Sequence, residues 1–541
     1  MPLIEIQNQQ SHVTGDGPEN APILLLVDCV SHADLTSQRP LTGAMGSVYL
    51  SQLRAKGIER SKIRIEAICE TISPRSSFYA LSEDARSYWR AHAFERIQRI
   101  ASQDSCRVIV PAGEEALRLT TGKAGLMKWH LSPLESIEPF GRKRTIPLLD
   151  PSYVMKVFRD IAYVAFGAKR ISEELLSPRE LRKRKFIIKP TLEETHDWIE
   201  KALRSEEVCI DIETGAGQIT CVGFSTDPGE ALCIQTLPKD RSSPEEFFAI
   251  WQAIARVCES PLRKVGQNIL YDATCLSAYG IRVRNIYHDT MMAMRFLNPE
   301  LAKGLDNCAR FYSYEPYWKD DAKDWGSRQS IEELYYYNCK DASITLEIAH
   351  AQIQQMREED SHARFHKLAM SLWCAAAEMS WTGFPVRMEE LLRLREVNAQ
   401  EIAKWQTTLD AEAQHFLGKP INGGSHMQVK ELLKAMGFRL PMKDGKETSN
   451  YGALCELRLK APDSKALEAL QRISKERKLR SSYLNYRFDE AKLRMFFTMY
   501  VNSTETGRWS SGTDPWGRGM NVQTVPRDGA MRRQFGYESP S

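Results

Sequence analysis

The sequence predicts a multidomain α/β protein whose last third is mostly helical. Through the first two thirds of the chain, short apolar runs alternate with helical patterns, as in parallel sheets covered by helices. From about residue 363 onward, long helical patterns replace this alternation. A chain of 541 residues is also too long for one hydrophobic core, so we expect three or four domains.

Composition and charge narrow the class of protein. A hydrophobic fraction of 42% and a charged fraction of 26% are ordinary for a globular protein. No apolar run approaches the roughly 18 residues that span a bilayer, and the start of the chain lacks the pattern of a secretion signal. The 12 cysteines show no Cys-x-x-Cys spacing and predict reduced thiols. We therefore expect a cytoplasmic location, in a bacterium or in a virus-infected host cell, with no membrane partner.

The first domain follows a short polar leader. Residues 1–21 contain Gly15, Gly17 and Pro18 and predict a loose segment. The apolar runs at 23–27 and 107–110 predict buried parallel strands, with a helix at 85–101 between them. The domain is expected over residues 22–176, and residues 177–190 predict a basic linker or an exposed helix end. From Arg179 to Lys189 this stretch carries six basic groups against one acid, which is typical of a solvated segment.

A second α/β domain is expected over residues 191–350. Segments 208–213, 219–224 and 231–234 are separated by Gly and Pro and predict a three-strand meander. In the first of them apolar and acidic residues alternate, which places Asp211 and Glu213 on one face of a strand. Two such carboxylates can bind one or two divalent cations, although a single Asp-x-Glu more often marks a solvated strand edge.

Two further pairs extend this carboxylate pattern. Asn268 and Asp272 are four residues apart, as are Tyr337 and Asp341, and each pair is expected on one face of a helix. Four carboxylates can hold two Mg²⁺ or Mn²⁺ ions, which activate water and stabilise the leaving oxygen of a phosphodiester. A nearby tyrosine hydroxyl can orient the attacking water. The expected metal ligands are Asp211, Glu213, Asp272 and Asp341.

These motifs resemble the 3′–5′ exonuclease domain of family A DNA polymerases. Residues 265–272 (Val-Gly-Gln-Asn-Ile-Leu-Tyr-Asp) are similar to its second exonuclease motif, and residues 288–299 to the segment that follows it. The resemblance covers about residues 186–350 and implies a ribonuclease-H-like fold and proofreading of a single-stranded 3′ end. By this resemblance Asn268 supports the 3′ end, and the catalytic residues are Asp211, Glu213, Asp272, Tyr337 and Asp341.

The helical region, residues 363–541, resembles the thumb and the start of the palm of the same polymerases. The similar motifs lie at 422–428, 478–483, 504–511 and 521–526. Residues 472–494 carry eight basic groups against three acids, which suits phosphate contacts along a duplex, although a solvated helix would show the same charges. The residues that the resemblance assigns to primer-template DNA are Asn422, Ser425, Lys478, Arg508, Asn521 and Gln523.

The palm and fingers motifs of that family do not occur before Ser541. We therefore expect that this chain does not polymerise unaided. It is expected to be either a truncated product or the N-terminal part of a split polymerase, completed by a partner chain that carries palm and fingers. The nearly neutral net charge of +3 leaves only local patches for nucleic acid.

The first domain is similar to the uracil-DNA glycosylase superfamily. The matching segments are 23–27, 39–46, 108–117 and 149–152. The departures are the absence of the four cluster cysteines, residues 27–31 in place of the water-activating loop, and Asp150-Pro-Ser152 in place of His-Pro-Ser. The resemblance therefore implies a glycosylase-like fold without base excision. Residual chemistry at Asp28 or Asp150, and an unrelated α/β domain, are the alternatives.

Three functions are compatible with these patterns. The leading hypothesis is the exonuclease-plus-thumb portion of a replicative family A DNA polymerase, of viral origin given the unusual first domain. The second is a stand-alone 3′–5′ exonuclease that grips duplex DNA with its helical region. The third is a non-catalytic subunit that binds DNA and assembles with a partner chain. Loss of all nuclease activity in clean protein would favour the third.

Overall fold

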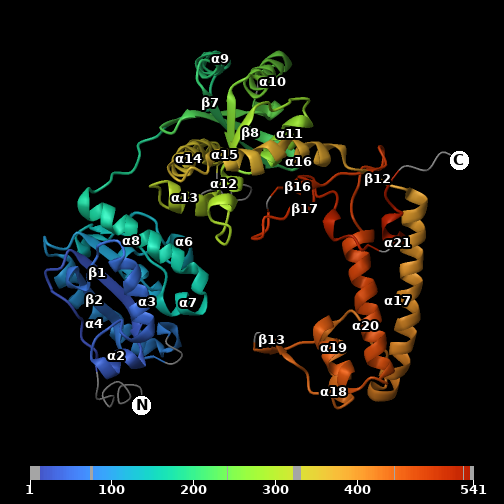
Figure 1. Cartoon of the computed structure of the whole chain (residues 1–541), viewed down its shortest axis with the longest axis horizontal. Coiled ribbons are helices and arrows are strands. Elements are labelled where there is room, and N and C mark those ends of the chain that lie inside the picture. Colours follow the sequence, from blue (N-terminus) through green and yellow to red (C-terminus); the bar gives the residue numbers. More distant parts are fainter. Residues whose placement is uncertain are drawn as a thin grey trace. The chain divides into compact units, whose positions relative to one another are not determined.

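The computed structural model separates into two compact units, Met1–Asp272 with Gly280–Phe365, and Ala273–Tyr279 with His366–Ser541. Figure 1 shows the elements of each unit. The first unit contains two sheets covered by helices, and the second is mostly helical, as the sequence predicts. The residues that the structure describes are 12–73, 77–240, 242–320, 330–443, 445–501, 503–527 and 529–536.

The first domain is built on a five-stranded sheet in the order β2-β1-β3-β5-β4. β1 pairs in parallel with β2 and β3, and β3 pairs in parallel with β5, which confirms the parallel strands predicted near residues 23 and 107. The strands are β1 (Ile23–Val30), β2 (Ile63–Ile72), β3 (Val108–Ala112), β4 (Leu134–Glu135) and β5 (Arg144–Thr145). The α-helices are α2 (His32–Ser37), α3 (Gly43–Arg54), α4 (Glu83–Ala101), α5 (Glu114–Thr121), α6 (Leu126–Trp129), α7 (Pro151–Lys156) and α8 (Ile161–Leu176).

From Ile23 to Val27, β1 is buried on both faces, which explains why this stretch is apolar at every position. Leu25 and Val27 belong to a core that includes residues of α3 and α8. Leu24 and Leu26 belong to a second core that includes residues of α4. A central parallel strand between two helical layers has no face left for polar side chains.

The prediction of a loose leader over residues 1–21 is wrong for residues 12–21. Val13 is 1% exposed and packs in the first core. Asp16 forms a β-bridge with Ile65, and its carboxylate is bound by Arg39 and Arg60 at 3.1 and 2.7 Å. Polar composition concealed this because the segment is held by backbone pairing and ion pairs. Residues 1–11 lie outside the described residues.

The second domain contains a six-stranded sheet in the order β11-β10-β7-β8-β9-β6. β7, β8 and β9 are antiparallel neighbours, which confirms the predicted meander. Helix α14 runs along one face of the sheet, and α9 and α10 lie on the other (Figure 1). The strands are β6 (Lys185–Ile188), β7 (Glu207–Gly215), β8 (Gln218–Asp227), β9 (Glu230–Gln235), β10 (Arg263–Gly266) and β11 (Ile286–Asp289). The helices are α9 (Leu192–Ala202), α10 (Pro244–Glu259), α11 (Ile269–Ser277), α12 (Thr290–Leu297), α13 (Leu305–Tyr312), α14 (Ile331–Glu358) and α15 (His362–Phe365).

The second unit has a long helical pair, α17 and α20, which lie side by side in Figure 1. The helix expected over 464–487 is shorter, because α20 ends at Leu479 and a π-helical turn, η8, continues to Leu484. The helices are α16 (Ser371–Thr382), α17 (Met388–Leu417), α18 (His426–Ala435), α19 (Tyr451–Lys460), α20 (Lys465–Leu479) and α21 (Gly529–Arg532). The paired strands are β12 (Phe384–Pro385) with β15 (Arg494–Met495), β13 (Met442–Lys443) with β14 (Lys446–Glu447), and β16 (Thr498–Tyr500) with β17 (Ser510–Gly512).

Across the residues that the structure describes, every helix is too short or too polar to cross a membrane. The basic segment 177–184 between the two sheet domains has no helix or strand, and β6 begins at Lys185. The alternative of an exposed helix end therefore does not hold for these residues.

Candidate metal centre and DNA-contact residues

Three of the four predicted metal-ligating carboxylates meet in one cluster. Asp211 and Glu213 project from β7, and Asp341 projects from α14, which packs against that strand. One ligand oxygen from each lies within 4.8 Å of the other two. The strand alternation and the helix position that the sequence indicates therefore converge on one site.

Asp272 lies beside this cluster and is not part of it. Its Oδ1 accepts a hydrogen bond of 2.9 Å from the backbone N–H of Ile212, the residue between Asp211 and Glu213. The carboxylate thus reaches the same stretch of β7 from α11. Of the four expected carboxylates, three (Asp211, Glu213 and Asp341) could therefore share one metal ion. The fourth, Asp272, is hydrogen-bonded to the backbone of β7.

Asn268 differs from its predicted place on a helix with Asp272. α11 begins at Ile269, and Asn268 precedes it with a left-handed φ of 56°. The turn is held by Asp289, which accepts hydrogen bonds of 3.1 Å from the N–H groups of Asn268 and Ile269. Asparagine tolerates the left-handed region better than most residues, which suits it to this position.

Burial makes this group of anions unfavourable in the free protein. Burial, followed by repulsion from Asp341, raises the pKa of Asp211 well above its usual range. Burial and then Asp341 raise the pKa of Glu213 to about 8. Burial raises the pKa of Asp272 to about 7. A divalent cation would lower these pKa values, because its positive charge offsets both the loss of hydration and the repulsion between the carboxylates.

Two residues that the sequence did not reveal also contact the cluster. Trp318 donates its indole N–H to Oδ1 of Asp341 at 2.6 Å. Lys319 donates to the hydroxyl of Tyr337 at 2.7 Å and forms an ion pair with Oδ2 of Asp341. Both follow α13 in an irregular segment, so no helix or strand spacing relates them to the motif at 337–341.

Asn338 is a third residue that sequence reasoning missed, although it lies inside the helical motif. Its amide donates to Oδ2 of Asp211 at 2.7 Å and to the backbone oxygen of that residue at 3.2 Å. Gly223 is the β8 partner of Asp211, and a Cβ atom there would lie 2.5 Å from Oδ1 of Asn338. Gly223 therefore leaves the space in which the Asn338 amide orients a ligand carboxylate.

The DNA-contact residues expected in the second unit fall into two groups. Asn422 and Ser425 flank the loop before α18, where Ser425 caps the helix, and the loop lies against Arg477 of α20. Lys478, next along α20, is exposed. The second group begins with Arg508, which is exposed in the loop between β16 and β17.

Asn521 and Gln523 complete the second group. Both are exposed, and the side-chain oxygen of Asn521 accepts a hydrogen bond of 3.1 Å from Ser511 of β17. This contact places Asn521 beside the hairpin that carries Arg508. Exposed guanidinium and amide groups on this hairpin and beside it are suited to hydrogen bonds with phosphates or minor-groove edges.

The two candidate acids of the first domain have structural partners. Asp28 accepts hydrogen bonds of 3.0 and 2.9 Å from the N–H groups of Glu115 and Ala116 at the start of α5. Burial raises the pKa of Asp28 to about 7. Asp150 caps α7, accepting from the N–H of Tyr153 at 3.0 Å. Both acids line a cavity of about 400 Å³, but each already serves a helix N-terminus.

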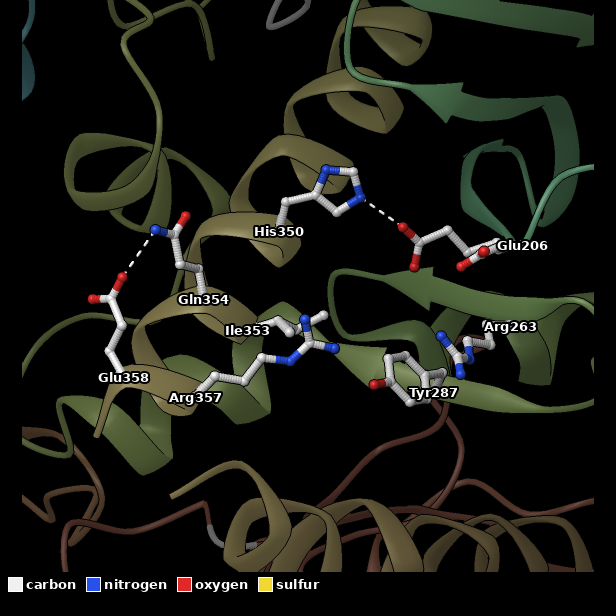
Figure 2. Close-up of a pocket in the computed structure, with 9 residues that line it drawn as sticks. Glu206, Arg263, Tyr287, His350, Ile353, Gln354, Arg357 and Glu358 are labelled. Carbon is white, nitrogen blue, oxygen red and sulfur yellow. Dashed lines mark hydrogen bonds and ion pairs between the residues drawn. The ribbon is translucent and has the colours of Figure 1, made fainter. Parts of the chain in front are cut away.

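A larger cavity of about 560 Å³ lies elsewhere on the second domain (Figure 2). Its walls mix opposite charges, with His350 bound to Glu207 at 2.6 Å and the Arg263 guanidinium 4.6 Å from the Tyr287 ring centre. None of the predicted site residues lines it. We place the candidate centre at the carboxylates, because their convergence and perturbed pKa values indicate chemistry more directly than cavity size does.

Comparison with known proteins agrees with this placement. Residues 186–356 match the family model of a 3′–5′ exonuclease, named for DNA polymerase A. The chain is 24% identical over 350 residues to DNA polymerase I of Borreliella burgdorferi, covering 62% of this chain and 37% of that protein. It is 26% identical over 279 residues to DNA polymerase I of Rhizobium leguminosarum, covering 49% of this chain and 26% of that protein.

A solved structure, the POL domain of Pol1 from M. smegmatis in complex with DNA primer-template and dNTP, is also similar. The TM-score is 0.48 at 21% identity, and the match covers 65% of this chain and 57% of that one. The chain spans well under half the length of the two curated relatives. Residues 186–356 therefore resemble a 3′–5′ exonuclease domain, and the chain is similar over part of its length to DNA polymerase I.

The change Gly223→Ala tests the role of the Asn338 amide. The added methyl group displaces Asn338 from Asp211, and we expect Mn²⁺ affinity to fall about tenfold, as for other residues that orient a metal ligand. Isothermal titration of the full chain with Mn²⁺ measures this. The matched control is Gly452→Ala in α19, where a Cβ atom meets only ordinary contacts. Wild-type affinity in folded Gly223→Ala protein would contradict the role given to Asn338.

Proposed function

We propose that this chain is a 3′–5′ exodeoxyribonuclease that removes nucleotides from single-stranded 3′ ends and proofreads DNA during replication. The observation that carries the proposal is the carboxylate cluster of Asp211, Glu213 and Asp341, with Asp272 held beside it. The match to the exonuclease family model over the same residues supports it. A protein that only bound DNA would gain nothing from burying mutually repelling acids.

The donor set fits hard divalent cations. All candidate ligands are carboxylate oxygens, which Mg²⁺ and Mn²⁺ prefer, and soft ligands such as cysteine are not among them. Asp211, Glu213, Asp341 and Asp272 would hold two ions. When bound, such a pair lowers the pKa of an attacking water and stabilises the leaving oxygen.

Tyr337 is the residue that we assign to orienting the water. Burial, followed by the nearby Asp341, raises the pKa of Tyr337 above its usual range, so its hydroxyl keeps its proton and can donate. Asn338 and Trp318 hold the carboxylates of Asp211 and Asp341 in place. Asn268, on the turn before α11, is assigned to the 3′ end of the substrate.

The central test is Asp211→Ala in the full chain. Degradation of a single-stranded 3′-labelled oligonucleotide should require Mg²⁺ or Mn²⁺, stop with a chelator, and fall about 10³-fold or more in the variant, as when a catalytic group is removed. Asp197→Ala, an exposed carboxylate on α9, is the matched control. Undiminished activity of the purified Asp211 variant would sink the assignment.

For the second unit we propose a thumb-like grip on primer-template DNA. The exposed Lys478 and Arg508, with Asn521 and Gln523, support phosphate and groove contacts. We further propose that this chain belongs to a split polymerase encoded by a virus. Polymerisation would then depend on palm and fingers segments supplied by another polypeptide. Primer extension by the chain mixed with a palm–fingers polypeptide measures that part, and failure of every such mixture would contradict it.

The grip predicts a specific salt dependence. Each phosphate contact contributes about one unit to the slope of log affinity against log salt, so Lys478→Ala should lower the slope by about 1. Fluorescence anisotropy with a primer-template duplex measures it. Lys460→Ala, whose ammonium is paired with Glu456 at 3.0 Å, is the control and should leave the slope unchanged. An unchanged slope in the Lys478 variant would remove that residue from the grip.

For the first domain we propose a glycosylase-like fold that no longer excises bases. The engagement of Asp28 and Asp150 at helix N-termini supports this, since each carboxylate has a structural role at the start of α5 or α7. The full chain should release no uracil from a uracil-containing oligonucleotide above the level of an Asp28→Asn, Asp150→Asn variant. Release by the wild type alone would overturn the proposal.

A further inference from the structure

The segment that brings Trp318 and Lys319 to the carboxylate centre is held from its other side by the first domain. This segment, residues 313–320, follows α13. Arg170 of α8 donates to the backbone oxygens of Arg310 and Ser313 at 2.9 and 2.8 Å, and also to the backbone oxygen of Leu131. One buried guanidinium of the first domain therefore fixes the end of α13 and the start of the segment.

Further contacts follow residue by residue along the segment. The hydroxyl of Tyr314 donates to Glu174 of α8. The backbone N–H of Tyr317 donates to the hydroxyl of Ser132 at 3.2 Å, and its ring packs edge-on against Trp129 at 5.7 Å. At the end of the segment, Asp320 forms an ion pair with Lys128 of α6. Residues on both sides of Trp318 and Lys319 are thus anchored to the first domain.

The two domains also share one apolar core. It contains side chains of α8, the β1–β3 sheet, α13 and α14, and Trp318 lies in it at 2% exposure. Among its members are Val164 and Ala168 of α8, Cys308 and Ala309 of α13, and Ile344 of α14. A continuous core means that the first domain is part of the support of this segment.

We propose that the first domain is a positioning element of the exonuclease centre, which holds residues 313–320 so that Lys319 directs the hydroxyl of Tyr337. This rests on the proposed exonuclease function. Because the Lys319 ammonium donates to the Tyr337 oxygen, the phenol proton is left to donate elsewhere, and charge-assisted bonding strengthens and orients that donation. A lysine has a long flexible stem, so a fixed backbone is needed to keep its ammonium in place.

The first experiment uses Lys319→Met, which keeps the length of the stem and removes the charge. On the full chain, kcat for a single-stranded 3′ end should fall at least about tenfold while KM for DNA stays within about twofold, as expected for a misplaced catalytic group. Lys319→Arg should recover part of kcat. Unchanged or increased kcat in Lys319→Met would overturn the proposal, an increase meaning that the ammonium blocks the centre.

The second experiment loosens the anchors without touching the centre. The double variant Tyr314→Phe, Ser132→Ala removes two hydrogen bonds and keeps the packed rings. We expect kcat of the double variant to fall about threefold or more. Adding Lys319→Met to the double variant should lower kcat by a smaller factor than the same change does in the wild type, because the effects of coupled residues are not additive. Tyr79→Phe, which loses a tyrosine–glutamate hydrogen bond within the first domain, is the matched control. Wild-type kcat in the folded double variant would overturn the coupling.

A readout that does not depend on activity separates this proposal from the proposed function. Hydrogen exchange of peptides covering residues 313–320 should quicken in the double variant and stay unchanged in Tyr79→Phe. Unaltered exchange would overturn the positioning role even in an inactive protein. If the wild type and Asp211→Ala both fail to degrade DNA, the exonuclease function is wrong, whereas activity that ignores the anchors contradicts only the role of the first domain.

Discussion

The placement of three neighbouring carboxylates on one strand and one helix is the constraint on which the second domain depends. Asp341 is buried and Asp211 and Glu213 are partly buried, and the three carboxylates repel each other, so each needs compensation. The protein supplies it from the Asn338 amide and the Lys319 ammonium. Cations would complete the balance, because a divalent ion offsets more negative charge than one ammonium can.

Local features of the sheet follow from the same constraint. A glycine at position 223 of β8 is needed because Asn338 occupies the space above it. The Asp289 carboxylate accepts hydrogen bonds from N–H groups at the starts of both α11 and α12, which fixes the turn at Asn268. These residues have structural roles: Gly223 leaves room for the Asn338 amide, and Asp289 fixes the turn at Asn268.

The first domain is more than a neighbour of this centre. Its helix α8 and the loop after α6 bind the segment that carries Trp318 and Lys319, and its core is continuous with that of α13 and α14. The carboxylates Asp28 and Asp150, which the resemblance to glycosylases made candidates for chemistry, serve helix termini. The contacts of this domain with the segment that carries Trp318 and Lys319 therefore support the positioning role proposed for it.

Pattern alone was sufficient for the features that repeat along the chain. Strand alternation placed Asp211 and Glu213 on one face, helical spacing placed Tyr337 and Asp341 together, and apolar runs located the parallel strands of the first domain. Each rests on a local period that neighbouring residues share. Polar composition led to the wrong prediction of a loose segment at residues 12–21, because the backbone pairing and ion pairs that hold it leave no periodic pattern in the sequence.

Tertiary structure decided the contacts between segments that no spacing connects. Lys319 and Trp318 reach Asp341 from an irregular segment, Asn338 depends on a glycine of another strand, and Asp272 stands beside the three-carboxylate group. The grouping of the DNA-contact residues expected in the second unit likewise depends on tertiary contacts, which bring the loop before α18 to α20 and Asn521 to β17. Such contacts are set by how helices and strands pack in three dimensions, and packing is a property of the whole core that a local pattern does not encode.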